Sequence, residues 1–362
     1  MPVAQLERKL KLVGKNQMVI QGPDMLRCFT LFLLLALGLV GCAKQVDVGD
    51  KNGDSKTSSK ATAPGTRTFE FVYGAVLTEL EPGAIVRVWL PVAKSGHDQT
   101  VERIATNLPS EYELTTEAKY GNDLIYFEAK ANDAGEVPIE VKYRVTRKEL
   151  TKANYEAATG ETATFLVSTS MVPTDESLRK QFMGESELTG DTLEIARQLY
   201  DGVDSHMKYD KPSDKPGWGN GDAEWACGNG FGNCTDFHSL FISSARNLEI
   251  PSRFEIGFPI PVKADAKVTE GKVGGYHCWA KFLADGRWVP VDISEADKHP
   301  ELKEYYFGSL TEDRVQFSVG RDLVLTPETA AETVNYLAYP YAEVNGKQHK
   351  SFRKAFQYSD IE

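Results

Sequence analysis

One cysteine lies where the chain around it predicts a nucleophile. Cys234 follows Gly232 and Asn233 and opens a run of apolar residues at helical spacing, so its thiol is expected at the first turn of a helix. Unpaired backbone N–H groups and the helix dipole at that end favour a thiolate and can stabilise an oxyanion. A thiolate attacks carbonyl carbon, but it needs a base and a group that orients the base.

The base and its carboxylate are expected on the two strands of one hairpin. The turn Asp285–Gly286 sets a register that places His277 opposite Ser294, with Asp292 as its diagonal neighbour on the same face. The other face of both strands is apolar. We therefore expect His277 and Asp292 to be exposed together and the apolar face to be buried.

The segment around these residues predicts two helices followed by an antiparallel sheet. Apolar residues recur at three- and four-residue spacing over 193–203 and 234–248, whereas 254–260 alternates. The expected fold is therefore an α+β domain over 171–325, in which helix-borne Cys234 packs on an antiparallel sheet.

Short alternating segments precede this domain and predict a β-rich region. Turn-forming pairs separate them, so we expect a β-sandwich-like domain over 69–170 that supports the catalytic part or positions its substrate. Residues 326–362 follow as a C-terminal extension. The alternating segments are Phe69–Val76, Ile85–Leu90, Leu124–Ala129 and Ile139–Thr146.

The first 41 residues have the pattern of an export signal. An apolar run over 29–40 follows Arg27 and is too short to span a bilayer. The sequence that ends at Gly41 resembles a bacterial lipobox, which implies that Cys42 is lipidated and becomes the first residue of the mature protein. We expect Met25 to be the true start.

The residues after Cys42 predict a tether. The segment 42–68 is rich in Lys, Ser, Thr, Gly and Asp and has almost no large apolar side chain, so it cannot offset the entropy of folding. The expected protein is exported and held by the lipid on Cys42 to a bacterial membrane, facing the periplasm or the cell surface.

Composition excludes several classes of protein. The 362 residues carry 41 Lys and Arg against 52 Asp and Glu, so the formal charge of −11 argues against a nucleic-acid partner. A hydrophobic content of 41% excludes collagen and a fully disordered chain. Five cysteines are too few for a disulfide-built scaffold.

Three blocks of sequence resemble the bacterial transglutaminase-like proteins, which are relatives of the papain-type thiol enzymes. The resemblance covers about 190–325 and implies that Cys234 is the nucleophile, His277 the general base and acid, and Asp292 the orienting carboxylate. The blocks are Gly232–Phe237, Gly275–Ala280 and Trp288–Asp292.

Three tryptophans complete the expected site. Trp225 and Trp218 are candidates for a second oxyanion donor or a substrate contact, and Trp279 is expected to pack beside the His277 ring.

The resemblance implies acyl transfer at a peptide or carboxamide carbonyl through a thioester on Cys234. We expect hydrolysis of a protein or peptide substrate, and nothing in these blocks requires a metal or an organic cofactor. Two other functions stay open. One is cross-linking of protein glutamine by transfer to an amine, and the other is non-catalytic binding or scaffolding in the cell envelope on the same fold.

Other interpretations of the cysteines and histidines also stay open. A disulfide between Cys227 and Cys234 would block the nucleophile. A soft metal site could be formed by Cys227, Cys234, His238 and His277. Otherwise His238 is expected to be a hydrogen-bonded helix residue and Cys278 a small core residue.

Overall fold

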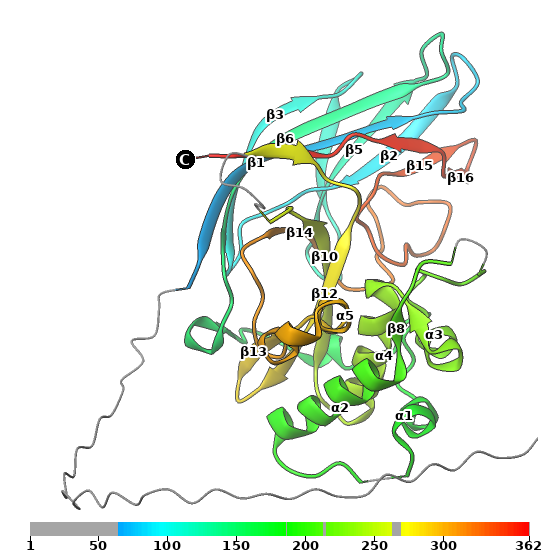
Figure 1. Cartoon of the computed structure of the whole chain (residues 1–362). Coiled ribbons are helices and arrows are strands. Elements are labelled where there is room, and N and C mark those ends of the chain that lie inside the picture. The colour runs from blue at the N-terminus through cyan, green and yellow to red at the C-terminus, as the bar shows by residue number, and fades with distance from the viewer. Residues whose placement is uncertain (1–63, 186, 213–214, 263–268, 362) are drawn as a thin grey trace, which may run out of the picture. The chain divides into compact units, whose positions relative to one another are not determined.

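The computed structural model describes residues 64–185, 187–212, 215–262 and 269–361, which belong to one compact unit (Figure 1). The predicted signal segment 1–41, Cys42 and most of the tether 42–68 lie outside the described residues. Within the described part, no helix is long and apolar enough to cross a membrane.

In the described residues, strands β1 to β7 precede the first α-helix, helices and strands are interspersed from α1 to α6, and strands β14 to β18 follow. The strands are β1 (Thr66–Leu77), β2 (Ile85–Pro91), β3 (Gln99–Asn107), β4 (Tyr112–Thr116), β5 (Asp123–Lys130), β6 (Val137–Lys148), β7 (Glu156–Ala157), β8 (Lys208–Tyr209), β9 (Phe231–Gly232), β10 (Ser252–Pro259), β11 (Glu270–Lys272), β12 (His277–Ala284), β13 (Arg287–Val291), β14 (Arg314–Val319), β15 (Tyr341–Val344), β16 (Lys347–His349), β17 (Phe352–Lys354) and β18 (Gln357–Asp360). The α-helices are α1 (Glu176–Met183), α2 (Thr192–His206), α3 (Ala223–Asn229), α4 (Cys234–Asn247), α5 (Ile293–Lys298) and α6 (Lys303–Tyr306), and 3₁₀ turns cover Lys152–Asn154, Ala163–Phe165 and Pro300–Leu302.

Two antiparallel sheets enclose the core of the β-rich part. One has the strand order β11-β18-β1-β6-β3, with β17 also paired to β1, and the other has the order β16-β15-β2-β5-β4. Burial alternates along β6, as a strand with one covered face requires. The four segments predicted as strands in 69–170 form β1, β2, β5 and β6.

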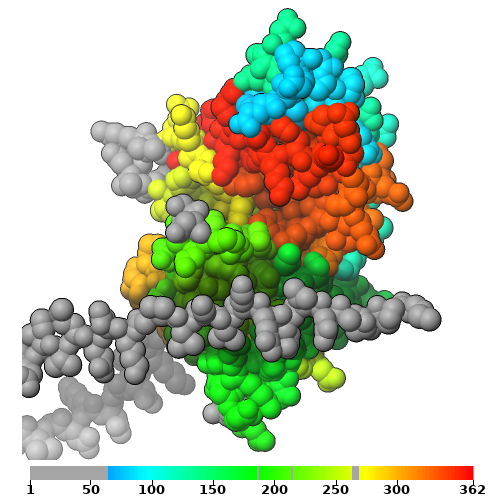
Figure 2. Space-filling view, turned by 90° about the vertical axis from the view of Figure 1, so that its right-hand side faces the viewer, coloured from blue at the N-terminus to red at the C-terminus, as the bar shows by residue number. Residues whose placement is uncertain are grey.

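The C-terminal segment 326–362 supplies strands to both of these sheets. β15 pairs with β2, whereas β17 and β18 pair with β1. Figure 2 shows the resulting contact, because the red surface of the C-terminal residues adjoins the blue surface of the N-terminal strands. The last residues of the chain therefore complete the β-rich part.

The predicted α+β part is a third sheet with helices packed on it. Its strand order is β14-β10-β12-β13-β7, and α4 packs on β10 and β12, where the rings of Phe241 and Phe282 lie 6.0 Å apart. Phe258 of β10 also reaches the β-rich core, 5.1 Å from the ring of Phe71. The predicted fold class is confirmed, with helices and antiparallel sheets preceded by a β-rich region.

Local predictions around the site are correct up to the end of β13. The second helix begins at Cys234, and the β12–β13 turn is the predicted two-residue turn, with positive φ at Asp285 and Gly286. The predicted pairing of His277 with Ser294 is wrong. β13 ends at Val291, because the next residue caps helix α5.

Candidate active site

Helix α4 places Cys234 at its first position. Asn233 is the N-cap, and its Oδ1 accepts a hydrogen bond of 2.8 Å from the Thr235 backbone N–H. The Asp236 carboxylate accepts in return from the Asn233 N–H at 2.9 Å. This reciprocal capping fixes the start of the helix, so Cys234 lies in the first turn, whose N–H groups have no partner within the helix.

Asp236 also holds the glycine-rich loop that precedes α4. Its two carboxylate oxygens accept from the N–H groups of Gly219 at 3.0 Å and Gly221 at 2.9 Å. Both glycines have positive φ, which lets the loop turn its N–H groups toward Asp236. Asp236 is therefore a buried side chain that fixes the loop carrying Trp218.

His277 begins β12, and Asp292 follows β13 directly. The His277 Nε2 and Asp292 Oδ2 atoms lie 2.7 Å apart, so the predicted contact is present. Because Nε2 is committed to Asp292, Nδ1 is the ring nitrogen left for the hydrogen bond that His277 shares with the Cys234 side chain. The three side chains therefore form a continuous Cys–His–Asp chain of contacts.

The predicted exposure of His277 and Asp292 is wrong. His277 is 6% exposed and Asp292 is fully buried. The polar face of β12 is not open to solvent, because the β-rich part covers it and supplies Asp98, which accepts from Lys281 Nζ at 3.2 Å. The hairpin register alone gave no sign of this cover.

Trp279 lies on the covered face and packs beside His277, as predicted. The two ring centroids are 6.3 Å apart. The indole N–H donates to Glu255 at 2.6 Å, and the guanidinium carbons of Arg314 and Arg147 lie 4.9 and 5.7 Å from the ring centroid. Trp279 is thus a structural support of the site, and its N–H is not available to a substrate.

Arg314 is a site residue that the sequence analysis missed. It begins β14, is buried, and donates from Nη1 to Asp292 Oδ2 at 3.1 Å. The other carboxylate oxygen, Oδ1, accepts from the Ser294 hydroxyl and from the Glu295 N–H, each at 3.2 Å. Asp292 is therefore held in place from three sides while it orients His277.

These contacts set the charges of the three residues. Burial alone would raise the pKa of Cys234, but hydrogen bonds from Cys278 and His277, together with the charge of His277, hold it well below its usual value. Burial lowers the pKa of His277, but Asp292 and Cys234 outweigh it and raise that pKa to about 10. At neutral pH the pair is therefore a thiolate and an imidazolium.

Asp292 completes the charge pattern. Its burial would raise the pKa of the carboxyl group, but the positive charges of His277 and Arg314 hold that pKa well below its usual range. The carboxylate therefore stays ionised and keeps the imidazolium of His277 both charged and oriented.

A second thiol touches the nucleophile. Cys278 is fully buried, as expected of a core residue, but its side chain is also hydrogen-bonded to the Cys234 sulfur. Burial and the neighbouring thiolate keep the pKa of Cys278 well above its usual value. Cys278 therefore stays protonated and acts as an S–H donor to Cys234.

The other interpretations of the cysteines do not fit the structure. Cys227 and Cys234 are both free thiols, so the disulfide hypothesis is wrong. Cys227 lies 3.5 Å from the Leu178 carbonyl oxygen and does not join a shared metal site. His238 accepts from the Ile293 N–H at 3.1 Å, which agrees with a hydrogen-bonded helix histidine. Among the described residues, no group of three His, Cys, Asp or Glu side chains is arranged to hold a metal.

Replacing Cys278 by alanine is expected to raise the pKa of Cys234 by about one unit, because a hydrogen bond to a charged group contributes about 1.5 kcal/mol and its loss destabilises the thiolate. The midpoint of the pH profile of Cys234 alkylation by iodoacetamide, followed by peptide mass spectrometry, measures this shift. Cys227→Ala is the matched control, since it removes a buried thiol that does not touch Cys234, and equal midpoints in the two variants would contradict the role of Cys278.

Two of the tryptophans do not serve as oxyanion donors. Trp218 lines the groove beside Cys234, but its indole N–H donates to the Asp210 carbonyl at 2.7 Å. Trp225 does not line that groove, and its ring packs on Phe231 with centroids 5.5 Å apart. Trp218 is thus placed for substrate contact only.

Asn233 offers the donor that the tryptophans lack. Its side chain lines the groove next to Cys234, and Nδ2 uses one hydrogen on the Tyr276 hydroxyl at 3.1 Å. The second hydrogen of Nδ2 and the backbone N–H of Cys234, at the first position of α4, are the candidate donors to an oxyanion formed in this groove.

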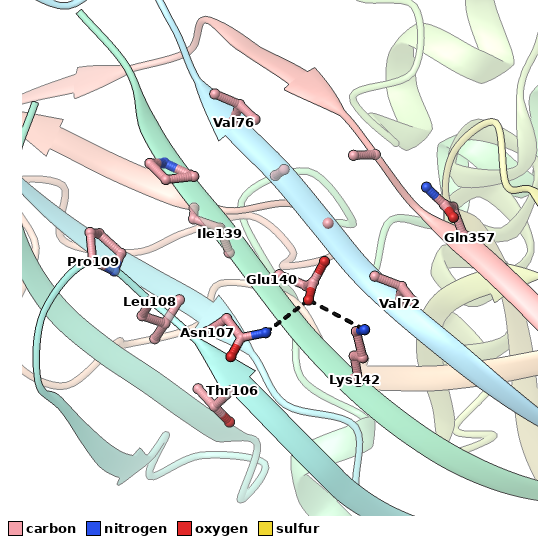
Figure 3. A pocket seen from close by; sticks show the side chains of 14 residues that line it. Val72, Val76, Thr106, Asn107, Leu108, Pro109, Ile139, Glu140, Lys142 and Gln357 are labelled. Atoms are coloured by element: carbon pink, nitrogen blue, oxygen red, sulfur yellow. Dashed lines mark hydrogen bonds and ion pairs between the residues drawn. The ribbon is translucent and has the colours of Figure 1, made fainter. Parts of the chain in front are cut away.

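An open groove of about 620 Å³ leads to Cys234 and His277. Aromatic side chains and two successive glycines, Gly274 and Gly275, form much of its wall. A hollow of about 720 Å³ on the outer face of β1 and β6 has no such chemistry: Glu140 there contacts Asn107 and Lys142, and no nucleophile is present (Figure 3). The groove at Cys234 is therefore the candidate active site.

Comparison with known proteins agrees with this geometry. Residues 180–293 match the family model of the transglutaminase-like superfamily. The chain therefore contains a transglutaminase-like domain, and Cys234, His277 and Asp292 all lie within the matched residues.

Individual relatives are more distant. An uncharacterized protein of Haemophilus influenzae is 33% identical over 175 residues, which are 40% of this chain and 47% of that protein, so the match spans about half of the curated relative. A candidate cysteine protease from Cytophaga hutchinsonii has 13% identity and a TM-score of 0.49, covering 83% of this chain and 99% of its own. The periplasmic domain of TgpA from Pseudomonas aeruginosa has 14% identity and a TM-score of 0.28, covering 62% and 94%.

Proposed function

We propose that this protein is a thiol hydrolase that cleaves a peptide or carboxamide bond in a protein or peptide substrate. The observation that carries the proposal is the contact chain of Cys234, His277 and Asp292 at an open groove. The proposed roles are nucleophile for Cys234, general acid and base for His277, and positioning carboxylate for Asp292.

The reaction follows from the charges of the pair. The Cys234 thiolate forms a C–S bond to the carbonyl carbon, and the oxyanion accepts from the Cys234 N–H and Asn233 Nδ2. His277 gives its proton to the leaving nitrogen as the C–N bond breaks, which leaves a thioester. His277 then takes a proton from water, whose oxygen displaces the Cys234 sulfur and releases a carboxylic acid.

The open groove supports water as the acyl acceptor. Lys211, Gly274 and Lys354 line it and are exposed to solvent, so water has access to a thioester on Cys234. A cross-linking enzyme has to exclude water in favour of an amine.

One assay of the full chain tests this proposal. Dimethylated casein is incubated with the protein and a fluorescent primary amine, and new amino termini, ammonia and bound fluorescence are measured. We expect wild type to produce new amino termini or ammonia and Cys234→Ala to produce neither. Fluorescent casein without hydrolysis would instead identify a cross-linking enzyme.

The location of the enzyme is part of the same proposal. The apolar run over 29–40 and the lipobox-like sequence at Cys42 support an exported protein that is anchored by lipid and acts at the cell envelope. The tether 42–68 would let the groove reach substrates near the membrane surface.

A further inference from the structure

The groove at Cys234 is lined by more positive than negative side chains. Lys211, Lys298 and Lys354 line it together with His277, which is an imidazolium, whereas Glu295 is the one carboxylate among the described residues of the lining. The whole chain has the opposite balance, with a formal charge of −11. Positive charge is thus concentrated where a substrate has to bind.

Two of these lysines, Lys211 and Lys354, have no ion-pair partner for Nζ among the described residues. The third, Lys298, pairs with Glu295, and its Nζ lies 4.6 Å from the centroid of the Tyr209 ring. Lys211 Nζ lies 5.5 Å from the same ring, without a carboxylate contact within the described part of the chain. Its Nζ forms no ion pair with a described residue, and the neighbouring Asp210 carboxylate accepts from the Lys211 backbone N–H instead.

Lys354 occupies a separate position in the groove. It comes from β17, and its Nζ lies 4.6 Å from the ring centroid of Tyr339, again without a carboxylate partner in the described ranges. Gly275 makes room for this arrangement, since a Cβ there would lie 2.8 Å from the Tyr339 hydroxyl and 3.5 Å from Lys354 Nζ. The backbone next to His277 is thus shaped around a lysine of the C-terminal strand.

We infer that the groove selects an acidic peptide, whose carboxylate side chains lie near Lys354 and near Lys211 while Cys234 attacks the backbone or side-chain carbonyl between them. This inference rests on the proposed thiol chemistry and names its substrate class. The aromatic rings hold each lysine ammonium group by cation–π contact, so the charges are positioned before the substrate binds. A local positive field also speeds the arrival of an anion at an otherwise acidic protein.

The alkylation of Cys234 by two small reagents tests the field without a known substrate. Iodoacetate carries a carboxylate and iodoacetamide does not, so the ratio of their rates reports the attraction of an anion and cancels any change in thiol reactivity. In the full chain at low salt, we expect the double variant Lys211→Gln/Lys354→Gln to lower this ratio about tenfold and each single change about threefold.

Lys347→Gln is the matched control. Lys347 is an exposed lysine of β16 that does not line the groove, so its replacement is expected to leave the ratio at the wild-type value. A ratio that is unchanged in the double variant, or that falls equally in the control, would overturn the inference. Slow reaction of wild-type Cys234 with both reagents would instead count against the proposed thiol chemistry.

A pair of peptide inhibitors tests the substrate class itself. Two peptide fluoromethyl ketones that differ only in Glu or Gln at the residues beside the reactive carbonyl should label Cys234 at different rates. We expect the Glu peptide to react about tenfold faster with wild type and to lose that advantage in the double variant. Equal labelling of wild type by both peptides would overturn the acidic-peptide assignment.

Discussion

Replacing His277 by alanine is expected to lower the rate of Cys234 alkylation at pH 6 about a hundredfold. Without the imidazolium, burial raises the pKa of Cys234. A thiol with an ordinary pKa of about 8.5 is only about 0.3% thiolate at pH 6. The greater nucleophilicity of a more basic thiolate offsets part of this loss. Peptide mass spectrometry of Cys234 after timed exposure to iodoacetamide measures the rate.

The pH profile separates an activated thiol from a resting one. In wild type the rate should rise through the lowered pKa of Cys234 and then stay level until His277 loses its proton near pH 10. His299→Ala is the matched control, because the His299 side chain is half exposed and its ion pairs among the described residues are with Glu295 and Glu301. If wild type and His277→Ala shared one profile with a midpoint near 8.5, the non-catalytic scaffold would be the better interpretation.

Replacing Asp98 by alanine is expected to lower the free energy of unfolding by about 3 to 5 kcal/mol, the usual effect of removing one partner of a buried ion pair. Asp98 accepts from Lys281 at 3.2 Å and lies 2.9 Å from Arg147 Nη2, and all three side chains are buried. In the variant, Arg147 loses the carboxylate at 2.9 Å from its Nη2. Lys281 keeps one close carboxylate, that of Glu255 at 3.3 Å. Urea unfolding of both proteins at pH 7 measures the difference.

The same comparison has a defined pH dependence. Burial would raise the pKa of Asp98, but Arg147 and Lys281 hold it well below its usual value. A carboxyl group whose pKa is lowered by folding stabilises the folded protein at pH values above its pKa in the unfolded chain, which is about 3.9. This stabilisation is lost as the pH falls toward the pKa of the folded state. The difference in free energy of unfolding between wild type and Asp98→Ala should therefore become smaller at acidic pH. Asp133→Ala, at an exposed turn, is the control, and a loss of similar size there would refute the buried-network argument.

The outcome at Asp98 bears on the active site as well as on stability. Lys281 and Trp279 share one face of β12, and Trp279 contacts both His277 and Arg314. The ion pairs of Asp98, Lys281 and Arg147 therefore lie next to the residues that support the site. A variant that unfolds more easily but keeps rapid Cys234 labelling would show that these ion pairs stabilise the fold and not the thiolate.

Local chemistry explains what could be predicted from the sequence. The start of α4 depends on Asn233 and Asp236, which cap residues within three positions of themselves. The β12–β13 register depends on the turn Asp285–Gly286, where both residues adopt positive φ. These short-range interactions bring His277 and Asp292 into contact whatever the rest of the chain does. A local interaction also explains why the predicted pairing of His277 with Ser294 is wrong. Asp292 caps helix α5, so strand β13 ends at Val291.

Long-range packing accounts for what the sequence could not show. Arg314 contacts Asp292, which is 22 residues away in the sequence, and Asp98 contacts Lys281, which is 183 residues away. An arginine beside the apolar strand residues Val315 and Phe317 hints at burial, but no local rule names its partner. Nor does a rule of spacing predict that Lys354 from the last strands would enter the groove.

The sequence by itself determined Cys234, His277 and Asp292 as the candidate triad and the elements that carry them, because capping, turn geometry and strand alternation act between near neighbours. Only the tertiary structure decided that His277 and Asp292 are buried, that Arg314 and Cys278 contact the triad and that lysines line the groove. Those features come from surfaces that meet when distant segments pack, and their positions depend on the whole fold rather than on any short stretch of residues.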